Sequence, residues 1–290
     1  MIEAYLIHLL ILIGIYLILA ISLQLALGFN GLSNFGHIAF FGIGAYTSAL
    51  LALSGWSFLI CFVSAGILAM IFGFLLAIPT NKLKGDYLAL ATMGFSFVVY
   101  AVLLNWTELT RGPLGIPGIP RPVLLGYSLS DNFSFLILTA VIALASYFVI
   151  YRITKSPFGK VIESIRDDEL ASRILGKNSF KTKSIILGVS AFFAGIAGSL
   201  YASYITFIDP SSFTMMQLVP VLLIVIVGGL ASLPGTIMAT FILMLVPEAL
   251  RFVGFPSSII GPMRQILYAL ILIIILIYKP KGFYGKVEMV

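Results

Sequence analysis

The sequence predicts an all-α polytopic membrane protein with about nine transmembrane helices, in a range of eight to ten, some of them broken or re-entrant. Its 290 residues include 17 Lys+Arg and 11 Asp+Glu, so 28 side chains are charged, while 60% of the residues are hydrophobic. A soluble domain has about 25% charged and 45–50% apolar residues. The mean hydropathy is +1.12. A soluble core could not bury this excess, so we expect one transmembrane domain over 1–290.

Nine apolar runs free of Lys, Arg, Asp and Glu define the expected spans. A helix needs about 20 such residues to cross the hydrocarbon core of a bilayer. Helices are required because lipid cannot satisfy backbone polar groups, and the run lengths exclude a barrel. The runs are 4–27, 35–53, 58–79, 87–106, 133–151, 184–207, 214–230, 235–246 and 266–278.

The basic residues predict the orientation. Three segments, 82–84, 152–183 and 279–286, hold 13 of the 17 Lys and Arg residues. Even numbers of spans separate these segments, so all three lie on one side, which the positive-inside rule makes cytoplasmic. The N-terminus is then outside, at the start of an uncleaved first span, and the C-terminus is cytoplasmic. The net charge of +6 is thereby explained without a nucleic-acid partner.

Two uncharged, Gly-rich stretches interrupt the apolar runs at 28–36 and 228–235. Such stretches free backbone groups that lipid cannot satisfy, so they belong inside protein or beside a cavity. Their partial likeness suggests an internal repeat. Each break is either a re-entrant turn or a loop.

No motif for catalysis or for a cofactor is present. The sequence has no P-loop, no Gly-x-Ser-x-Gly elbow, no paired carboxylates in a span and no Cys/His cluster for a metal. The single cysteine, Cys61, fits a buried apolar position. We therefore expect no enzyme activity, no cofactor, no bound metal and no built-in ATP hydrolysis.

Glu248 and His37 are the candidate polar residues in or beside the spans. Glu248 lies near the outer end of the eighth run and has Arg251 three residues on as a partner for an interfacial ion pair. His37 follows the first break in a run of small residues that allows close helix packing. It makes a structural hydrogen bond or lines a polar path. A self-sufficient secondary carrier would use these two residues as its polar centres.

The charged segment 152–183 contains 12 of the 28 charges. Its apolar residues Ile162 and Ile165 lie on one helical face, whereas Leu170 and Ile174 fall on the opposite one. Two helical pieces joined near 166–169 fit this phase change, with Asp167 or Asp168 as the cap of the second. Gly176 is a natural helix stop. The segment is a solvated loop or a docking element for a soluble partner.

Five separated blocks together carry a resemblance to a known family. They are GLSNFGHIAFFGIGAYTSALL (31–51), LKGDYLALATMGF (83–95), RGPLGIPGIP (111–120), GKVIESIRDDELASRILG (159–176) and FIDPSSFTMMQLVPVLLIVIVGGLASLPGTIMATFIL (207–243). In this order they resemble the membrane permease subunits of ABC importers for branched-chain amino acids, of the type of the larger of the two permeases.

This resemblance implies the ABC importer permease fold in a prokaryotic cytoplasmic membrane. It also implies a second permease subunit, two cytoplasmic ATP-binding subunits and an extracytoplasmic substrate-binding protein as partners. Related permeases for urea or short amides share several blocks, so these substrates remain an alternative, as do a secondary transporter and a membrane scaffold. The coupling loop would use Gly159, Glu163, Arg166, Asp167, Asp168, Glu169, Ala171, Leu175 and Gly176. The translocation pathway would pass Gly31, Ser33, Gly36 and His37.

Overall fold

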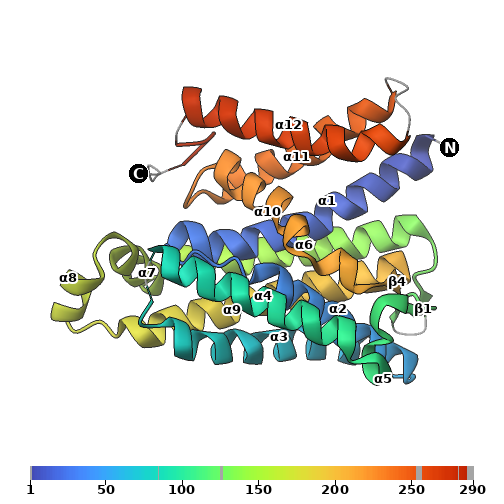
Figure 1. Ribbon diagram of the computed structural model, residues 1–290, viewed down its shortest axis with the longest axis horizontal. Coiled ribbons are helices and arrows are strands. Elements are labelled where there is room, and N and C mark those ends of the chain that lie inside the picture. The colour runs from blue at the N-terminus through green and yellow to red at the C-terminus, as the bar shows by residue number, and fades with distance from the viewer. Residues whose placement is uncertain (1, 84, 125–126, 253–256, 280, 286–290) are drawn as a thin grey trace.

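The computed structural model describes residues 2–83, 85–124, 127–252, 257–279 and 281–285. Helices dominate the described chain (Figure 1). The first half contains α1 (Ile2–Gln24), a π-helix η1 (Leu25–Phe29), α2 (His37–Leu53), α3 (Phe58–Thr80), α4 (Gly85–Asn105), α5 (Thr107–Thr110) and a 3₁₀ turn η2 (Gly112–Leu114). The second half contains α6 (Asn132–Lys155), α7 (Pro157–Asp167), α8 (Glu169–Ile174), α9 (Ser179–Ile205), η3 (Pro210–Phe213), α10 (Met215–Gly228), α11 (Leu233–Phe252) and α12 (Ser257–Tyr278).

Each of the nine predicted apolar runs coincides with a helix. Among the described residues, 6 helices are long and apolar enough to cross a membrane. The other three runs are covered by α2 (His37–Leu53) and by the fully described parts of α11 and α12, Leu233–Glu248 and Gly261–Ile275, which are apolar stretches of 10–17 residues. The polytopic helical class is therefore confirmed, and the count of nine crossings stays a prediction.

The centre of the bundle is a close three-helix packing of α2, α3 and α9. A Cβ on Gly44 would lie 2.2 Å from the carbonyl oxygen of Gly195, and one on Gly198 would lie 2.1 Å from that of Phe41. Ser48 and Ser199 share a hydrogen bond of 2.7 Å across the same crossing. Small residues let helices approach to backbone contact, which is how helices associate without a hydrophobic driving force in lipid. The expected small-residue face after the first break is confirmed at Gly44.

The remaining helices surround this centre in layers. α1 packs on α6, α9, α10 and α11, and α4 lies against α2 and α3. In Figure 1, α11 and α12 form a separate upper layer, with α10 between them and the lower bundle. Because α1 touches both layers, it connects the compact bundle to the α10–α12 group.

The two ends of the bundle differ. One end has α5 and short strands, with β1 (Ile116–Pro117) antiparallel to β4 (Phe207–Ile208) and β2 (Val123–Leu124) antiparallel to β3 (Tyr127–Ser128). The other end has α7 and α8 (Figure 1). Described parts of the basic segments or their neighbours lie near this second end: Asn81, next to the first segment, lines one small pocket with Lys183 of the second, and Gly282 of the third packs on Gly229 near the second break. Their expected location on one side of the bundle is thus supported by the fold.

Candidate functional site

The predicted docking segment folds as two short helices with an abrupt turn between them. α7 ends at Asp167, and α8 begins at Glu169. The Asp168 carboxylate accepts hydrogen bonds from the backbone N–H groups of Leu170 at 2.9 Å and Ala171 at 3.0 Å. These are N–H groups that the start of a helix otherwise leaves unsatisfied. The division into two helical pieces and the cap by Asp168 are both confirmed.

The two glycines that bound the segment shape its backbone. A Cβ on Gly159 would lie 2.1 Å from the carbonyl oxygen of Thr154, so the corner between α6 and α7 closes only around a glycine. Gly176 follows Leu175, the C-cap of α8, and has a φ of +79°, which a glycine adopts without strain. The predicted helix stop at Gly176 is confirmed.

Glu169 fixes α8 to the start of α9. Its carboxylate pairs with Arg173 at 2.7 Å and with Lys183 at 2.8 Å, and it accepts a hydrogen bond from the Ser179 hydroxyl at 2.8 Å. Burial by itself raises the pKa of this carboxyl, but the hydrogen bonds from Lys183 and Ser179 and the charges of Lys183 and Arg173 outweigh it. The pKa of Glu169 is lowered to about 2. Glu169 therefore stays ionised and holds α8 in place.

Three apolar side chains of α8 and its cap face solvent, and we name them the α8 patch: Leu170 (63% exposed), Ile174 (86%) and Leu175 (76%). This segment lies outside the apolar spans, so lipid does not account for their exposure. Large exposed apolar side chains grouped on one short element mark a surface for another protein. Of the other predicted coupling residues, Asp167, Ala171 and Gly176 are exposed and Glu163 is partly buried.

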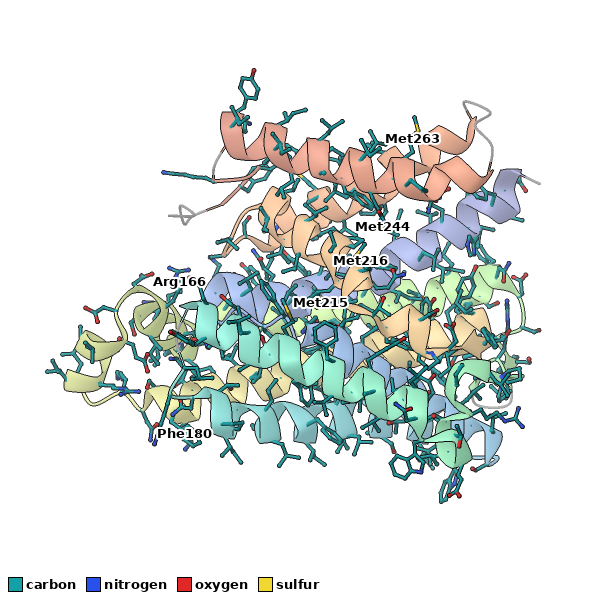
Figure 2. All side chains as sticks on the ribbon, in the orientation of Figure 1. Arg166, Phe180, Met215, Met216, Met244 and Met263 are labelled. Carbon is teal, nitrogen blue, oxygen red and sulfur yellow. The ribbon has the colours of Figure 1, made fainter. Side chains whose placement is uncertain are left out.

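Arg166 points from α7 into the bundle instead of toward solvent. Its Nη1 donates to the carbonyl oxygen of Gly28 at 3.2 Å, and its Nε donates to Asp167 Oδ1 at 2.8 Å. Its side chain is 15% exposed. Gly31, at a φ of +67°, has room for no Cβ because the Cγ of Arg166 would lie 2.9 Å away. Arg166 thus joins the predicted coupling loop to the first helix break; Figure 2 labels it at the end of the bundle that carries α7 and α8.

Side chains of α4 satisfy backbone groups of the first break at Ser33 and Phe35. The Thr92 hydroxyl donates to the carbonyl oxygen of Ser33 at 3.0 Å, and its oxygen accepts from the N–H of Phe35 at 3.0 Å. Ser96 donates to the carbonyl oxygen of Phe35 at 3.0 Å. Non-helical backbone at membrane depth needs such partners inside the protein. The break is therefore an ordered loop held by α4.

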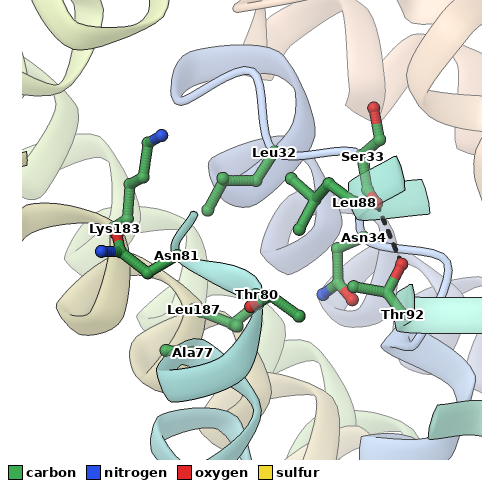
Figure 3. A pocket seen from close by; sticks show the side chains of 10 residues that line it. All are labelled: Leu32, Ser33, Asn34, Ala77, Thr80, Asn81, Leu88, Thr92, Lys183 and Leu187. Atoms are coloured by element: carbon green, nitrogen blue, oxygen red, sulfur yellow. Dashed lines mark hydrogen bonds between the residues drawn. The ribbon is translucent and has the colours of Figure 1, made fainter. Parts of the chain in front are cut away.

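A small pocket adjoins this loop (Figure 3). Ser33, Asn34 and Thr92 line one side of it, and Asn81 and Lys183 line another. Its volume is about 10 Å³, which is room for about one water molecule. The space beside the first break is therefore too small for an amino acid in this conformation.

Gln24, the last residue of α1, connects the segment just before the first break to the second break. Its Nε2 donates to the carbonyl oxygen of Gly229 at 2.7 Å and approaches that of Ser232 at 3.4 Å. Gly28 lies so close to the second break that a Cβ there would be 2.7 Å from the backbone nitrogen of Ala231. Gln24 is fully buried. The two breaks, about 200 positions apart in sequence, form one continuous polar junction.

The chain near its C-terminal end closes the junction from the other side. The N–H of Phe283 donates to the carbonyl oxygen of Val227 at 2.9 Å, and that of Tyr284 donates to Gly228 at 3.2 Å. Gly229, at a φ of +95°, would bring a Cβ within 2.2 Å of the nitrogen of Gly285. The second break is therefore a tight turn packed under residues 281–285.

Of the predicted pathway residues, Gly36 and His37 are buried, Ser33 is partly buried and Gly31 is exposed. His37 is fully buried, with Nε2 at 2.9 Å from Ser22 Oγ and 3.1 Å from the carbonyl oxygen of Leu19. A Cβ on Gly36 would lie 3.0 Å from the carbonyl oxygen of Thr92. For His37 the geometry agrees with a structural hydrogen bond, one of the two roles the sequence left open.

Sequence reasoning missed the residues that hold the junction together. Gln24 and Thr92 are uncharged, so a search for charges in the spans passed over them. A signal existed: Gln24 is a lone amide in an apolar helix, and Thr92 and Ser96 share a face four residues apart.

Glu248 has partners on other helices. The side chain of Arg251 lies outside the described residues, so the predicted pair between Glu248 and Arg251 stays a prediction. Glu248 pairs with Arg264 of α12 at 2.5 Å and accepts a hydrogen bond from the Tyr5 hydroxyl of α1. These contacts tie α1, α11 and α12 together, and no short sequence spacing predicts them.

Comparisons with known proteins agree on one family. The family described as branched-chain amino acid transport system / permease component matches residues 5–276. The chain is 37% identical to the high-affinity branched-chain amino acid transport system permease protein LivM of Escherichia coli (strain K12) over 293 residues, 92% of this chain and 67% of that protein. It is 25% identical to a probable LivM of Methanocaldococcus jannaschii, over 93% of this chain and 90% of that one.

A second kind of relative is also similar. The chain is 24% identical to the high-affinity branched-chain amino acid transport system permease protein LivH of Escherichia coli (strain K12), over 94% of this chain and 92% of that protein. No solved structure matches the chain.

Proposed function

Because this chain belongs to the family of permease components of branched-chain amino acid transport systems, we propose that it is the transmembrane permease subunit of an ATP-driven importer for these amino acids. Its greater identity to LivM, 37%, than to LivH, 24%, supports the role of the larger of two permeases. All described spans form one transmembrane domain around the α2–α3–α9 centre. The relatives are transport permeases, so the chain moves a solute and catalyses no reaction itself.

The proposed complex contains a second permease, two ATP-hydrolysing subunits and an external binding protein. Relatives of both the LivM and the LivH kind support a pair of permeases. The sequence contains no P-loop, so the energy of ATP arrives from a separate subunit. The α8 patch, on the charged segment 152–183, is the surface that this subunit would contact.

The membrane is a prokaryotic cytoplasmic membrane, and the end with α7 and α8 faces the cytoplasm. The supporting observation is that described parts of the basic segments or their neighbours lie near that end, read with the positive-inside rule. The N-terminus then lies outside and the C-terminus in the cytoplasm.

One observation carries the coupling mechanism: Arg166 reaches from α7 to the carbonyl oxygen of Gly28 and lies against Gly31. When the ATPase moves the α8 patch, α7 moves with it and Arg166 displaces the first break. Gln24 passes that displacement to the second break through Gly229. Both breaks thereby change together, which is what opening one end of a pathway requires.

Charge reversal at Arg166 tests this mechanism. In proteoliposomes with the whole complex, Arg166→Glu should lower ATP-driven leucine uptake at least tenfold, because a carboxylate cannot donate to the carbonyl oxygen of Gly28. ATP hydrolysis and co-purification of the ATPase subunits should persist. Lys160→Glu is the matched control, since Lys160 is exposed on the same helix, and it should transport normally.

Two results would overturn the proposals separately. Full uptake by the Arg166→Glu complex would refute the coupling route. Leucine uptake by this chain without ATPase subunits, driven by a proton or sodium gradient, would refute the importer itself and favour a secondary carrier.

A further inference from the structure

A large cavity lies at the opposite end from α7 and α8, between α1, α10 and α12, with the ends of α9 and α11. Its volume is about 570 Å³, within the range of small-molecule sites. Figure 2 shows Met216 on α10 and Met244 in the space below α12, and both line the cavity. None of the predicted pathway residues, Gly31, Ser33, Gly36 and His37, is part of its wall.

The wall combines one ion pair with extensive apolar surface. Glu248 and Arg264, at 2.5 Å, both line the cavity. The apolar part of the wall includes Leu9 and Leu12 of α1, Val219 and Leu223 of α10, and Leu272 of α12. An acid, a guanidinium and aliphatic side chains therefore surround a single space.

The guanidinium retains binding capacity. Arg264 has five N–H donors in a fixed fork, and its Nη2 is the donor to Glu248. Its Nε is buried and has no hydrogen-bond partner among the described residues. A buried donor without a partner is costly, and a planar carboxylate is the group that such a fork binds best.

An ion pair in the wall of a mostly apolar cavity also needs a reason to be there. The described spans contain few charged residues, and a paired charge in low dielectric often stabilises a protein less than apolar residues of the same size. A ligand that carries both charges resolves this, because its carboxylate can bind Arg264 while its ammonium binds Glu248. The total charge of the site is unchanged when such a ligand enters.

We propose that this cavity binds the zwitterion of an amino acid with an aliphatic side chain, and that Arg264 and Glu248 recognise its carboxylate and its ammonium. The proposal rests on the proposed import function, for which it supplies the substrate contact on this subunit. The aliphatic walls on α1 and α10 take the side chain. The site lies at the end that would receive substrate from outside.

Protection of a cysteine from alkylation tests occupancy directly. Met244→Cys in a Cys61→Ala background, within the whole complex in nanodiscs without ATP, should react with a maleimide, and leucine should slow that reaction. Leucinol, which lacks the carboxylate, and 4-methylpentanoate, which lacks the ammonium, should each protect at least tenfold less well. Tyr127→Cys is the control, because Tyr127 is 79% exposed on a strand outside the cavity.

Combining the change of ligand, leucine to leucinol, with a change of Arg264 shows whether Arg264 binds the ligand carboxylate or only forms a structural ion pair with Glu248. If Arg264 binds the carboxylate, Arg264→Gln should abolish the preference for leucine over leucinol. If the pair is only structural, that preference survives, and the proposal is overturned. Should Arg264→Gln not accumulate, Arg264→Lys keeps the charge without the planar fork and should weaken the preference in the same direction.

The remaining outcomes are equally decisive. Protection by leucine without any ATP-driven uptake would keep the site and refute the importer. ATP-driven leucine uptake without protection of the cysteine would support the importer and refute the binding site in this cavity. Protection that is complete before leucine is added and disappears on delipidation would assign the cavity to an acyl chain and overturn the proposal.

Discussion

The α2–α3–α9 centre and the α7–α8 element are held together by opposite means. In the centre, Gly44, Gly195 and Gly198 allow backbones to touch. In the α7–α8 element, charged side chains hold the helices in place, through the cap by Asp168 and the ion pairs of Glu169. Each kind of contact suits its surroundings. In lipid the hydrophobic effect does not drive helices together, so close backbone packing holds them. The α7–α8 element lies outside the apolar spans, and polar contacts hold it together.

The difference teaches which part can move. A crossing at backbone contact has no alternative register nearby, because interiors packed at this density do not deform continuously. A short helix held by one cap and one ionic cluster can open at modest cost. Motion at α8 should therefore pass along α7 and Arg166 to the helix breaks and leave the centre unchanged.

The largest expected effect is in the centre. Gly44→Leu would force α2 and α9 apart, because even a Cβ would lie 2.2 Å from the Gly195 carbonyl oxygen. We expect a loss of about 3 kcal/mol or more, seen as little folded protein in size-exclusion chromatography and a lower unfolding temperature. Gly94→Leu is the control, since nothing lies within 4 Å of a Cβ there. Equal stability of the two variants would refute the close crossing.

An intermediate effect is expected at Glu169, and it depends on pH. The pKa of Glu169 is about 2 in the folded protein, below the ordinary value of about 4.3. Its contribution is therefore fully present above the ordinary pKa and is lost as pH falls through the folded pKa. The shift alone corresponds to about 3 kcal/mol, and solvent screening lowers this to on the order of 2 kcal/mol, or about 30-fold in local opening.

Hydrogen exchange over 169–183 measures this contribution. Near pH 6, Glu169→Gln should exchange faster than the wild type, and the difference should shrink as pH approaches 2. Glu163→Gln on α7 is the control and should exchange like the wild type throughout. A difference between wild type and Glu169→Gln that persists at pH 2 would show that the cluster acts by shape and not by charge.

The sequence predicted those features that depend on local pattern. The apolar runs, the two breaks, the small-residue face at Gly44, the helix stop at Gly176 and the cap by Asp168 all follow from residues close in the chain. They reflect hydropathy, backbone conformation and capping, which are local properties.

Contacts between distant segments could not be predicted in this way. Arg166 meets Gly28 and Gln24 meets Gly229 because the bundle folds back on itself, and no spacing rule encodes that. For the same reason the sequence did not predict the pair of Glu248 with Arg264, a residue of the next helix.

The smallest expected effect is at the cap of α8, and it tests whether the α7–α8 element can open independently of the α2–α3–α9 centre. Asp168→Ala removes the acceptor for two N–H groups and should cost about 1 kcal/mol, which is about fivefold faster exchange within 169–174. Asp168→Asn should behave like the wild type, because its side-chain oxygen can still accept both bonds. The unfolding temperature of the whole protein should not change in either variant, since the centre does not depend on α8. If Asp168→Ala lowers that temperature as well, α8 and the α2–α3–α9 centre unfold together, and the α7–α8 element cannot move independently of it.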